Sequence, residues 1–328
     1  VMPVEPLFGA YNADTNQSLD RIRFMGEDKA GICTRRLRQS IGKEGFPIHE
    51  AITRDAYAAA HGKPLEVASW LSPLIAGVVW NDDPQYLMRK AFFNGGMGKL
   101  SRFQKLIESK DIGTLTGRSH FGDLQYLHAM APRTTGDLVL GTQETHDAIT
   151  AWLKTAYEVS IGLIPHDARV VDTPLATFAE GLACRVEGSA TPATCTVLDV
   201  FDPDHFWREE DETPAQVTRQ LALGAMLHTV QDAFSRSHVQ RDEAREGWPV
   251  VRYYSYPNEL HCVHDMVLEA NREPIRRAAE ASRRIAVLST RGAPWAEVEP
   301  VVARIFAPAV PFDAAAGNAT AMVGEAHP

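Results

Sequence analysis

The sequence predicts an all-α fold, a single multi-helix domain with long loops. Apolar residues recur at helical spacing in several long segments, whereas the strict alternation of a half-buried strand is scarce. No internal repeat is present. A chain of 328 residues with 45% hydrophobic content is large enough to bury a substantial core. We therefore expect one helical domain that carries elaborated loops.

The expected helices share apolar positions three and four residues apart. They span residues 49–61, 64–79, 150–164, 213–234, 260–289 and 295–306. Thr213 and Pro214 form an N-cap and N1 pair for the helix over 213–234. Pro274 predicts a break or kink within 260–289, because proline cannot donate to the helical hydrogen-bond ladder.

The other segments predict how the domain is bounded. The helical domain is expected to span 1–306, with residues 1–45 as an N-terminal arm. Residues 166–212 look like an insertion, and their Pro-, Thr- and Asp-rich part, 166–204, suits a short β-hairpin. The Ala-, Gly- and Pro-rich residues 307–328 predict a loosely ordered tail.

The charge balance argues against a surface that binds a polyanion. The formal net charge is −9, whereas a nucleic-acid-binding surface is expected to be basic. No stretch approaches the roughly 18 apolar residues of a membrane span, and no signal peptide is present in this chain. We expect no stable nucleic-acid complex, and the sequence implies no protein partner.

Four cysteines fit two disulfides. Cys184 and Cys195 flank a Gly-, Ser-, Thr- and Pro-rich segment and could close a loop, which would leave Cys33 and Cys262 as the second pair. The pairing stays open, and free thiols are the alternative. The sequence contains no Cys-x-x-Cys motif, so a zinc ribbon is not expected. Disulfides would indicate an oxidising compartment, so we expect a secreted or periplasmic protein.

His228, Asp232 and His238 form the most informative motif. Because His228 and Asp232 are four residues apart, a helix would place them on one face, where they could share a metal ion. Imidazole with carboxylate and no thiolate suits a hydrolytic zinc ion better than a structural one. The alternative is a satisfied core histidine, a capping aspartate and a surface histidine.

A second pair, His261 and Asp265, has the same spacing. Asn258 could cap a helix through the 260s, which would place both side chains on one face. Two facing helices that each carry a histidine and a carboxylate are a common way to build a polynuclear metal site.

Further candidates lie upstream. His49 stands at the start of an expected helix, and His120 follows a loop rich in Gly and Thr. Asp82 and Asp83 are adjacent carboxylates before Pro84, and they should repel each other unless a cation lies between them. Taken singly, each has an ordinary alternative: a solvated turn for the carboxylates and a surface imidazole for each histidine.

Together these motifs resemble the superfamily of bacterial zinc-dependent phospholipases C and S1/P1-type nucleases. The central pattern, His-x3-Asp-x5-His, occupies 228–238. The tripeptides Ser119-His120-Phe121 and Ser255-Tyr256-Pro257 resemble those of the phospholipase branch. Asp265 and the number of residues between His238 and His261 are closer to the nuclease branch. The resemblance covers scattered motifs from about residue 46 to 270.

The resemblance implies a site with two to three zinc ions, bridged by Asp232. The first ion would be held with His228, His120 and one of Asp82 and Asp83, and the second by His238, His261 and Asp265. His49 and Asp232 would hold the third, for which the family usually also provides an N-terminal Trp. This chain begins with Val1, and His49 is far along it.

The implied activity is that of a phospholipase C. Water activated by the zinc ions would attack the glycerol-side phosphodiester bond of a glycerophospholipid, with Asp82 or Asp83 orienting the water or taking its proton. Such an enzyme would contact a membrane surface transiently. The alternatives are a single-strand nuclease or nucleotidase on the same scaffold, and a non-catalytic secreted effector or interaction protein in which zinc is structural.

Overall fold

A computed structural model shows the protein to be mostly helical. It describes residues 48–66, 72–84, 86, 112–134, 138–176, 194–202, 212–256 and 269–312. Within these ranges the structure contains helices and one two-stranded antiparallel sheet. This confirms the predicted all-α class with a short hairpin. None of the described helices is both long enough and apolar enough to cross a bilayer.

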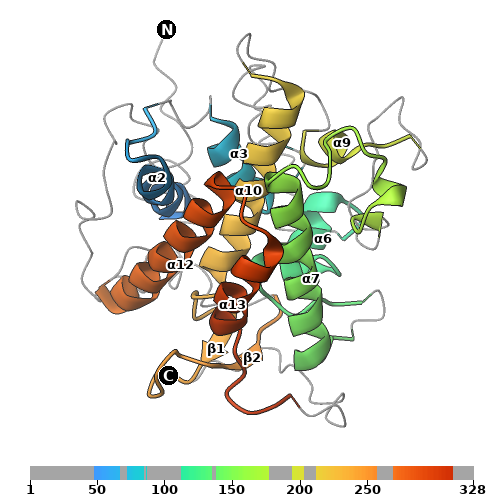
Figure 1. The fold of residues 1–328 in the computed structure, drawn as a ribbon. Helices are drawn as coiled ribbons and strands as arrows, with labels where there is room; N and C mark the ends of the chain where they lie inside the picture. Colours follow the sequence, from blue (N-terminus) through green and yellow to red (C-terminus); the bar gives the residue numbers. More distant parts are fainter. Residues whose placement is uncertain are drawn as a thin grey trace, which may run out of the picture.

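Helix α10 (Pro214–Asp232) runs through the centre of the molecule (Figure 1). It packs against α3 (Pro73–Trp80), α7 (Thr142–Ser160) and α12 (Arg272–Thr290). Every residue from Ala225 to Asp232 is buried, so this part of the helix has no solvent face. The polar side chains of its last turns are therefore carried into the protein interior.

Two glycines allow α3 and α10 to cross with their backbones in contact. A Cβ atom on Gly77 would lie 2.2 Å from the carbonyl oxygen of Leu221, and one on Gly224 would lie 2.3 Å from that of Leu74. Real Cβ contacts do not come this close, so any side chain at either position would push the helices apart. The crossing brings the chain after α3 close to the last turns of α10.

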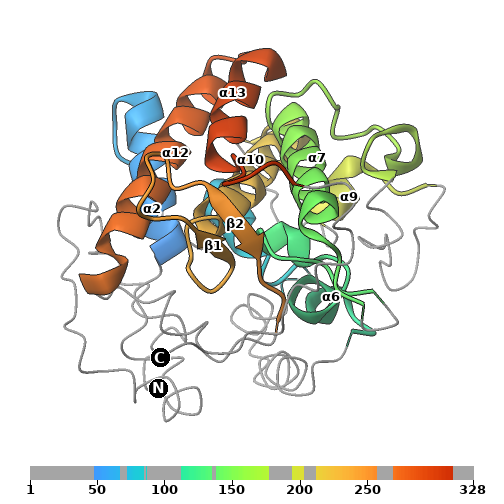
Figure 2. The same ribbon diagram turned by 90° about the horizontal axis from the view of Figure 1, so that it is seen from below.

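The remaining elements surround this pair. Figures 1 and 2 show α2 and α12 on one side of α10, and α7, α6 and α9 on the other. Their bounds are α2 Ile48–His61, α6 Leu115–Phe121, η3 Gln125–His128, η4 Val170–Asp172, α9 Val197–Phe201, η5 Glu269–Asn271 and α13 Trp295–Ile305.

The helix starts follow the capping residues of the sequence. Thr213 caps α10 as predicted, in a reciprocal capping box with Gln216. The helix predicted over 64–79 begins only at Pro73, because Ser72 accepts a hydrogen bond from the Ile75 N–H and acts as its N-cap.

Two other predictions about helices also need correction. Pro274 does not break a helix: it lies in the first turn of α12, where its missing N–H costs no hydrogen bond. Helix α7 begins at Thr142, earlier than the predicted 150.

The described hairpin lies outside 166–204, where a hairpin was predicted; residues 177–193 of that segment lie outside the described residues. Strands β1 (Val239–Arg241) and β2 (Val250–Tyr253) pair directly after α10, whereas the described part of 166–204 contains η4, α9 and one isolated bridge. The β-branched residues of β1 and β2 suit a sheet, and their alternation is too short to stand out in the sequence.

The start of the C-terminal tail is more ordered than predicted. Ala307 accepts a hydrogen bond from the Val250 N–H, and the Ala309 N–H donates one to the Val250 carbonyl. Residues 307–309 are thus held against β2, and only 313–328 lie outside the described residues.

Cys195 is buried and is not a free thiol. Cys33, Cys184 and Cys262 lie outside the described residues, so the disulfide pairing stays a prediction.

Candidate metal centre

Imidazoles and carboxylates from several elements converge in one cluster, which we call the metal centre. Helix α2 and η3 supply one imidazole each, the turn after α3 supplies a carboxylate, and α10 with the segment after it supplies the others. The members are His49, Asp82, His128, His228, Asp232 and His238. All except His128 were candidates from the sequence.

Three ligand atoms meet at the middle of the metal centre. Nδ1 of His128 and Nε2 of His228 lie 3.0 Å apart, and each is 2.9 Å from Oδ2 of Asp232. All three side chains are almost completely buried. For comparison, two nitrogen ligands of tetrahedral zinc, each at about 2.0–2.1 Å from the ion, stand about 3.3 Å apart. The arrangement is therefore close to that of ligands around one ion.

The hydrogen bonds of the outer ring nitrogens turn the inner nitrogens of both rings towards the middle of the metal centre. His228 donates from Nδ1 to the Val78 carbonyl at 2.6 Å, and His128 donates from Nε2 to the Asn81 carbonyl at 3.1 Å. Because a carbonyl can only accept, the outer nitrogen of each ring carries a proton, and the inner nitrogen of a neutral ring is an acceptor that can bind a metal ion. Backbone carbonyls commonly orient metal-binding histidines in this way.

A shared cation is needed to hold these lone pairs together. Burial opposes a charge on His228, but the carboxylates of Asp232 and Asp82 outweigh it and raise the pKa of His228 to about 10. Without a metal, a proton on His228 would provide the cation. A metal ion bound there would have to displace that proton, so its binding would be linked to proton release.

His49 extends the metal centre towards α2. Its Nδ1 donates to Oε1 of Gln231 at 2.8 Å, and the amide of Gln231 is oriented by donating to Thr53 at 3.0 Å. Nε2 of His49 then lies 3.4 Å from Oδ1 of Asp232. The ring of His49 also stacks on that of His228, with centroids 4.3 Å apart.

Asp232 faces histidines with both carboxylate oxygens. Oδ1 is the atom near His49, while Oδ2 lies near His128 and His228, and 3.4 Å from Nδ1 of His238. Burial opposes the negative charge, but His238 and His228 outweigh it and, with hydrogen bonds from the imidazoles, hold the pKa of Asp232 well below its usual range. The geometry is that of a carboxylate able to bridge two ions.

Asp82, and not Asp83, faces the imidazoles. Its oxygens lie 3.8–4.0 Å from ring nitrogens of His120, His128 and His228, and these histidines lower the pKa of Asp82 against the opposing effect of burial. The side chain is 40% exposed, so the metal centre is open to solvent on this side. Asp83 is buried, and the ion pairs with these three imidazoles are made by Asp82.

His128, which the sequence reasoning did not consider, holds the position beside His228 that the resemblance assigns to His120. His120 lies in the last turn of helix α6, where its Nδ1 bonds to the Thr116 carbonyl at 2.9 Å, and its ring lies 5.1 Å from that of His128. It lies at the edge of the metal centre, next to Asp82.

His238 is oriented by the backbone of η3. Its Nδ1 donates to the carbonyl of His128 at 2.7 Å, so Nε2 is the nitrogen able to bind a metal. The partners that the resemblance gives it, His261 and Asp265, lie outside the described residues.

Two residues near the metal centre were missed by the sequence reasoning. His128 lies in the apolar stretch 124–131, and a histidine in such a stretch signals a buried imidazole. Glu50, on the first turn of α2, is only 8% exposed. Burial raises the pKa of the Glu50 carboxyl, although His49 and His228 act against this and Asp82 adds to it.

The described residues thus contain two groups able to hold a metal ion. One group is His49, His228 and Asp232, and the other is Asp82, His128 and His228. Within each, the ligand atoms lie within 4.8 Å of one another. Nitrogen and carboxylate donors without thiolate suit a catalytic rather than a structural zinc ion.

Asn81 ties together the backbone around the metal centre. Its Nδ2 donates to the carbonyls of Leu127 at 2.6 Å and Ala225 at 3.2 Å and to Oγ1 of Thr229 at 3.1 Å, while its own carbonyl orients His128. Asn81→Ala should lower the free energy of unfolding by about 2 kcal/mol. It should also weaken metal binding roughly 10- to 100-fold, as loss of outer-shell support does.

Competition with a chromogenic chelator and urea unfolding would measure the two effects. Val298→Ala provides the control, because it truncates a buried side chain of α13, away from the metal centre. It should lower stability and leave metal affinity unchanged. Equal metal affinities for the two variants would show that Asn81 has no positioning role.

No protein-family model, curated protein or solved structure matches this chain. The resemblance to the zinc phospholipase C and S1/P1 nuclease superfamily therefore depends on the motifs themselves.

Proposed function

We propose that this protein is a zinc-dependent phospholipase C that hydrolyses the glycerol-side phosphodiester bond of glycerophospholipids. The observation that carries the proposal is the convergence of His49, His128, His228 and Asp232 on mutually close ligand atoms, with Asp82 on a solvent-open side. His228 and Asp232 share one helix, but the other residues come from separate elements. Histidines scattered over the surface by chance would not bring their ligand atoms together in this way.

The residues of the metal centre would share the work as follows. Asp232 would bridge two zinc ions, His128, His228 and Asp82 would hold one, and His49 would hold another. Bound zinc supplies Lewis acidity, which lowers the pKa of water and neutralises charge on a phosphoryl group. Asp82 would orient the attacking water, and Glu50, as a buried carboxyl with a raised pKa, would hold a proton beside it.

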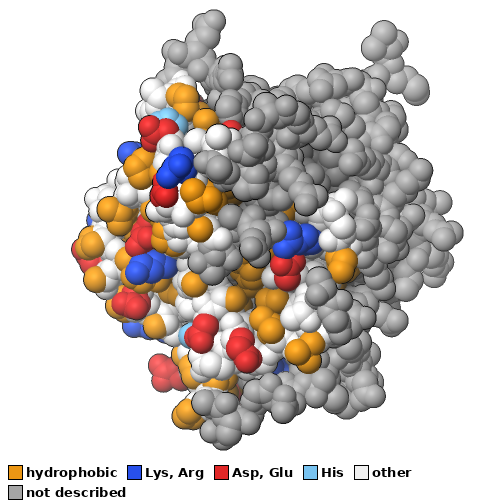
Figure 3. Space-filling model, turned by 90° about the vertical axis from the view of Figure 1, so that its right-hand side faces the viewer, with side chains coloured by type: hydrophobic (Ala, Val, Ile, Leu, Met, Phe, Trp, Pro, Cys, Tyr) orange, Lys and Arg blue, Asp and Glu red, His pale blue; other side chains and the backbone are white. Residues whose placement is uncertain are grey.

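Two features favour a lipid ester over a nucleic acid. The chain is acidic, and on the described part of the face in Figure 3 acidic, basic and hydrophobic side chains are interspersed rather than gathered into a basic track. The Ser-His-Phe and Ser-Tyr-Pro motifs also resemble those of the phospholipase branch. We place the proposed phospholipase outside the cytoplasm, as a secreted or periplasmic protein. It would meet its lipid substrate during transient contact with a membrane surface.

Turnover on three substrates tests the proposal. The zinc-loaded protein should release diacylglycerol from phosphatidylcholine vesicles and cleave a chromogenic phosphocholine ester. It should leave single-stranded DNA intact, and a chelator should abolish the lipid activity because the zinc ions supply the Lewis acid.

Each other outcome points to a different function. Turnover of DNA or of nucleoside monophosphates in place of lipid would favour the nuclease or nucleotidase. Zinc that raises the melting temperature, with no turnover of any substrate, would indicate a non-catalytic protein with structural zinc.

A further inference from the structure

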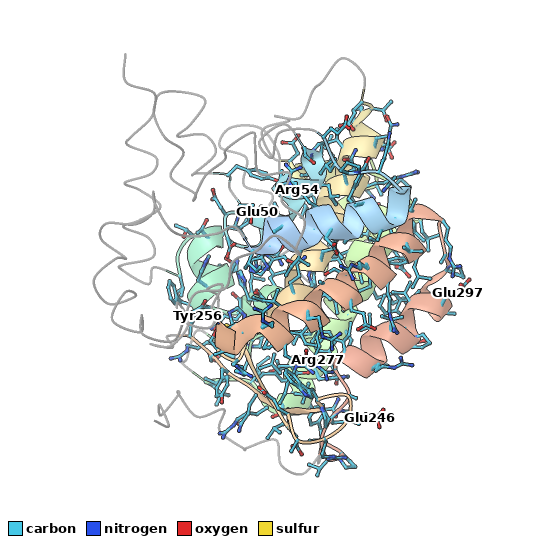
Figure 4. The ribbon with its side chains drawn as sticks, turned by 90° about the vertical axis from the view of Figure 1, so that its left-hand side faces the viewer. Glu50, Arg54, Glu246, Tyr256, Arg277 and Glu297 are labelled. Atoms are coloured by element: carbon cyan, nitrogen blue, oxygen red, sulfur yellow. The ribbon has the colours of Figure 1, made fainter. Side chains whose placement is uncertain are left out.

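An apolar pocket opens directly beside the metal centre. It lies between the start of α2, the end of α10 and the first turns of α12, and has a cavity volume of about 40 Å³, which makes it narrow and suited to a slender group. Figure 4 shows α2 and α12 side by side, with Glu50 marking the start of α2. His49 and Asp232 of the metal centre line the pocket, together with Gln231 and Ser235. The other lining residues are the apolar Ile48, Ile52, Phe234, Pro274, Ile275 and Ala278.

The residues that line this pocket are of two kinds. Two of them belong to the metal centre, where Nε2 of His49 and Oδ1 of Asp232 lie 3.4 Å apart. Most of the others are apolar, and Ile48 and Ile275 among them are partly exposed, so their apolar surface faces the pocket or solvent instead of being sealed in the core. An apolar group that covers such surface gains the free energy of removing it from water.

We propose that the pocket binds the apolar substituent of a phosphate ester whose phosphate group lies at the metal centre. The inference depends on the proposed function only in placing a phosphate at His49 and Asp232. An alkyl chain suits the walls, because the polar edge of a nucleobase would find few partners among them beyond Gln231 and Ser235. The pocket would thus select amphiphilic phosphate esters over small polar ones.

Binding of short alkyl phosphates tests the proposal without any turnover. Methyl, ethyl, propyl, butyl and hexyl phosphate, all too short to form micelles, would be titrated into the zinc-loaded full chain by calorimetry. Affinity should rise roughly fourfold for each of the first methylene groups and then level off when the pocket is full. Equal affinities for methyl and hexyl phosphate would overturn the proposal.

Matched variants on α12 locate the effect. Ala278→Phe should fill the pocket and abolish the gain with chain length, while methyl phosphate binds as before. Since Ala278 is buried and this variant could misfold, Ile275→Ser is the second test, and it should at least halve the gain per methylene. Val287→Ser, on the exposed part of the same helix, should keep the wild-type gain. A wild-type gain in both pocket variants would place the alkyl group elsewhere and contradict the proposal.

The same titrations separate this inference from the proposed function. A gain with chain length in a protein that hydrolyses no phospholipid would support the pocket and refute the phospholipase. Phospholipid turnover without any gain of affinity with alkyl chain length would support the phospholipase and refute the pocket. Thymidine 5′-phosphate that binds more tightly than butyl phosphate would show a site for nucleosides and overturn the proposal.

Discussion

Asp232→Asn should abolish phospholipid hydrolysis, with a loss of turnover of at least about 10³-fold. Asp232 faces histidines with both carboxylate oxygens, His49 with one and His128 with His228 with the other. An asparagine has nearly the same shape but lacks the charge, so it cannot bridge two cations. The variant should also retain less than half of the zinc of the wild type, measured by atomic absorption.

The matched control is Asp172→Asn. Asp172 is an exposed carboxylate paired with Arg169 in η4, far along the chain from the metal centre. Exposed pairs of this kind contribute little, so activity and zinc content should not change. Asp232→Asn with wild-type turnover and zinc content would contradict the bridging role.

Gly224→Ala should destabilise the protein by about 3 kcal/mol, although alanine is the better helix former. In an ordinary helix interior this change stabilises by up to about 1 kcal/mol. Here the new methyl group would lie 2.3 Å from the Leu74 carbonyl oxygen and 2.5 Å from the Val78 nitrogen, so α3 and α10 must separate. The sign of the change in the free energy of unfolding therefore distinguishes helix propensity from the close crossing.

Loss of zinc affinity should accompany this loss of stability. Val78 accepts the hydrogen bond that orients His228, and the turn after α3 carries Asp82, so a shift of α3 moves two proposed ligands relative to α10. Urea unfolding and chelator competition would measure both effects. A more stable Gly224→Ala protein with unchanged zinc affinity would show that the helices do not cross as closely as described.

Local spacing allowed part of the metal centre to be predicted from the sequence. His228 and Asp232 lie on one helix, where a separation of four residues determines their relative position whatever the rest of the chain does. The start of that helix was also predictable, since Thr213, Pro214 and Gln216 act only on their neighbours. Such signals need no knowledge of tertiary structure.

The rest of the metal centre depends on tertiary contacts that no spacing reveals. His128 reaches His228 because η3 packs against α10 and bonds to Asn81, the residue after α3, and because the chain turns at Ala129, a non-glycine residue with φ of +52°. A turn after α3 decides between Asp82 and Asp83, and their sequence neighbours offer no reason to prefer either. The Ser-His-Phe motif, which led to the choice of His120, lies only a few residues before His128, the histidine that contacts His228.

An anomalous-scattering map at the zinc edge, from crystals of the zinc-loaded protein, tests the central claim most directly. We expect a strong peak about 2.0–2.2 Å from Nδ1 of His128, Nε2 of His228 and the carboxylate of Asp232, and a second peak beside His49 on the other oxygen of Asp232. Peaks only at surface residues, with these imidazoles and carboxylates bound to no metal, would contradict it.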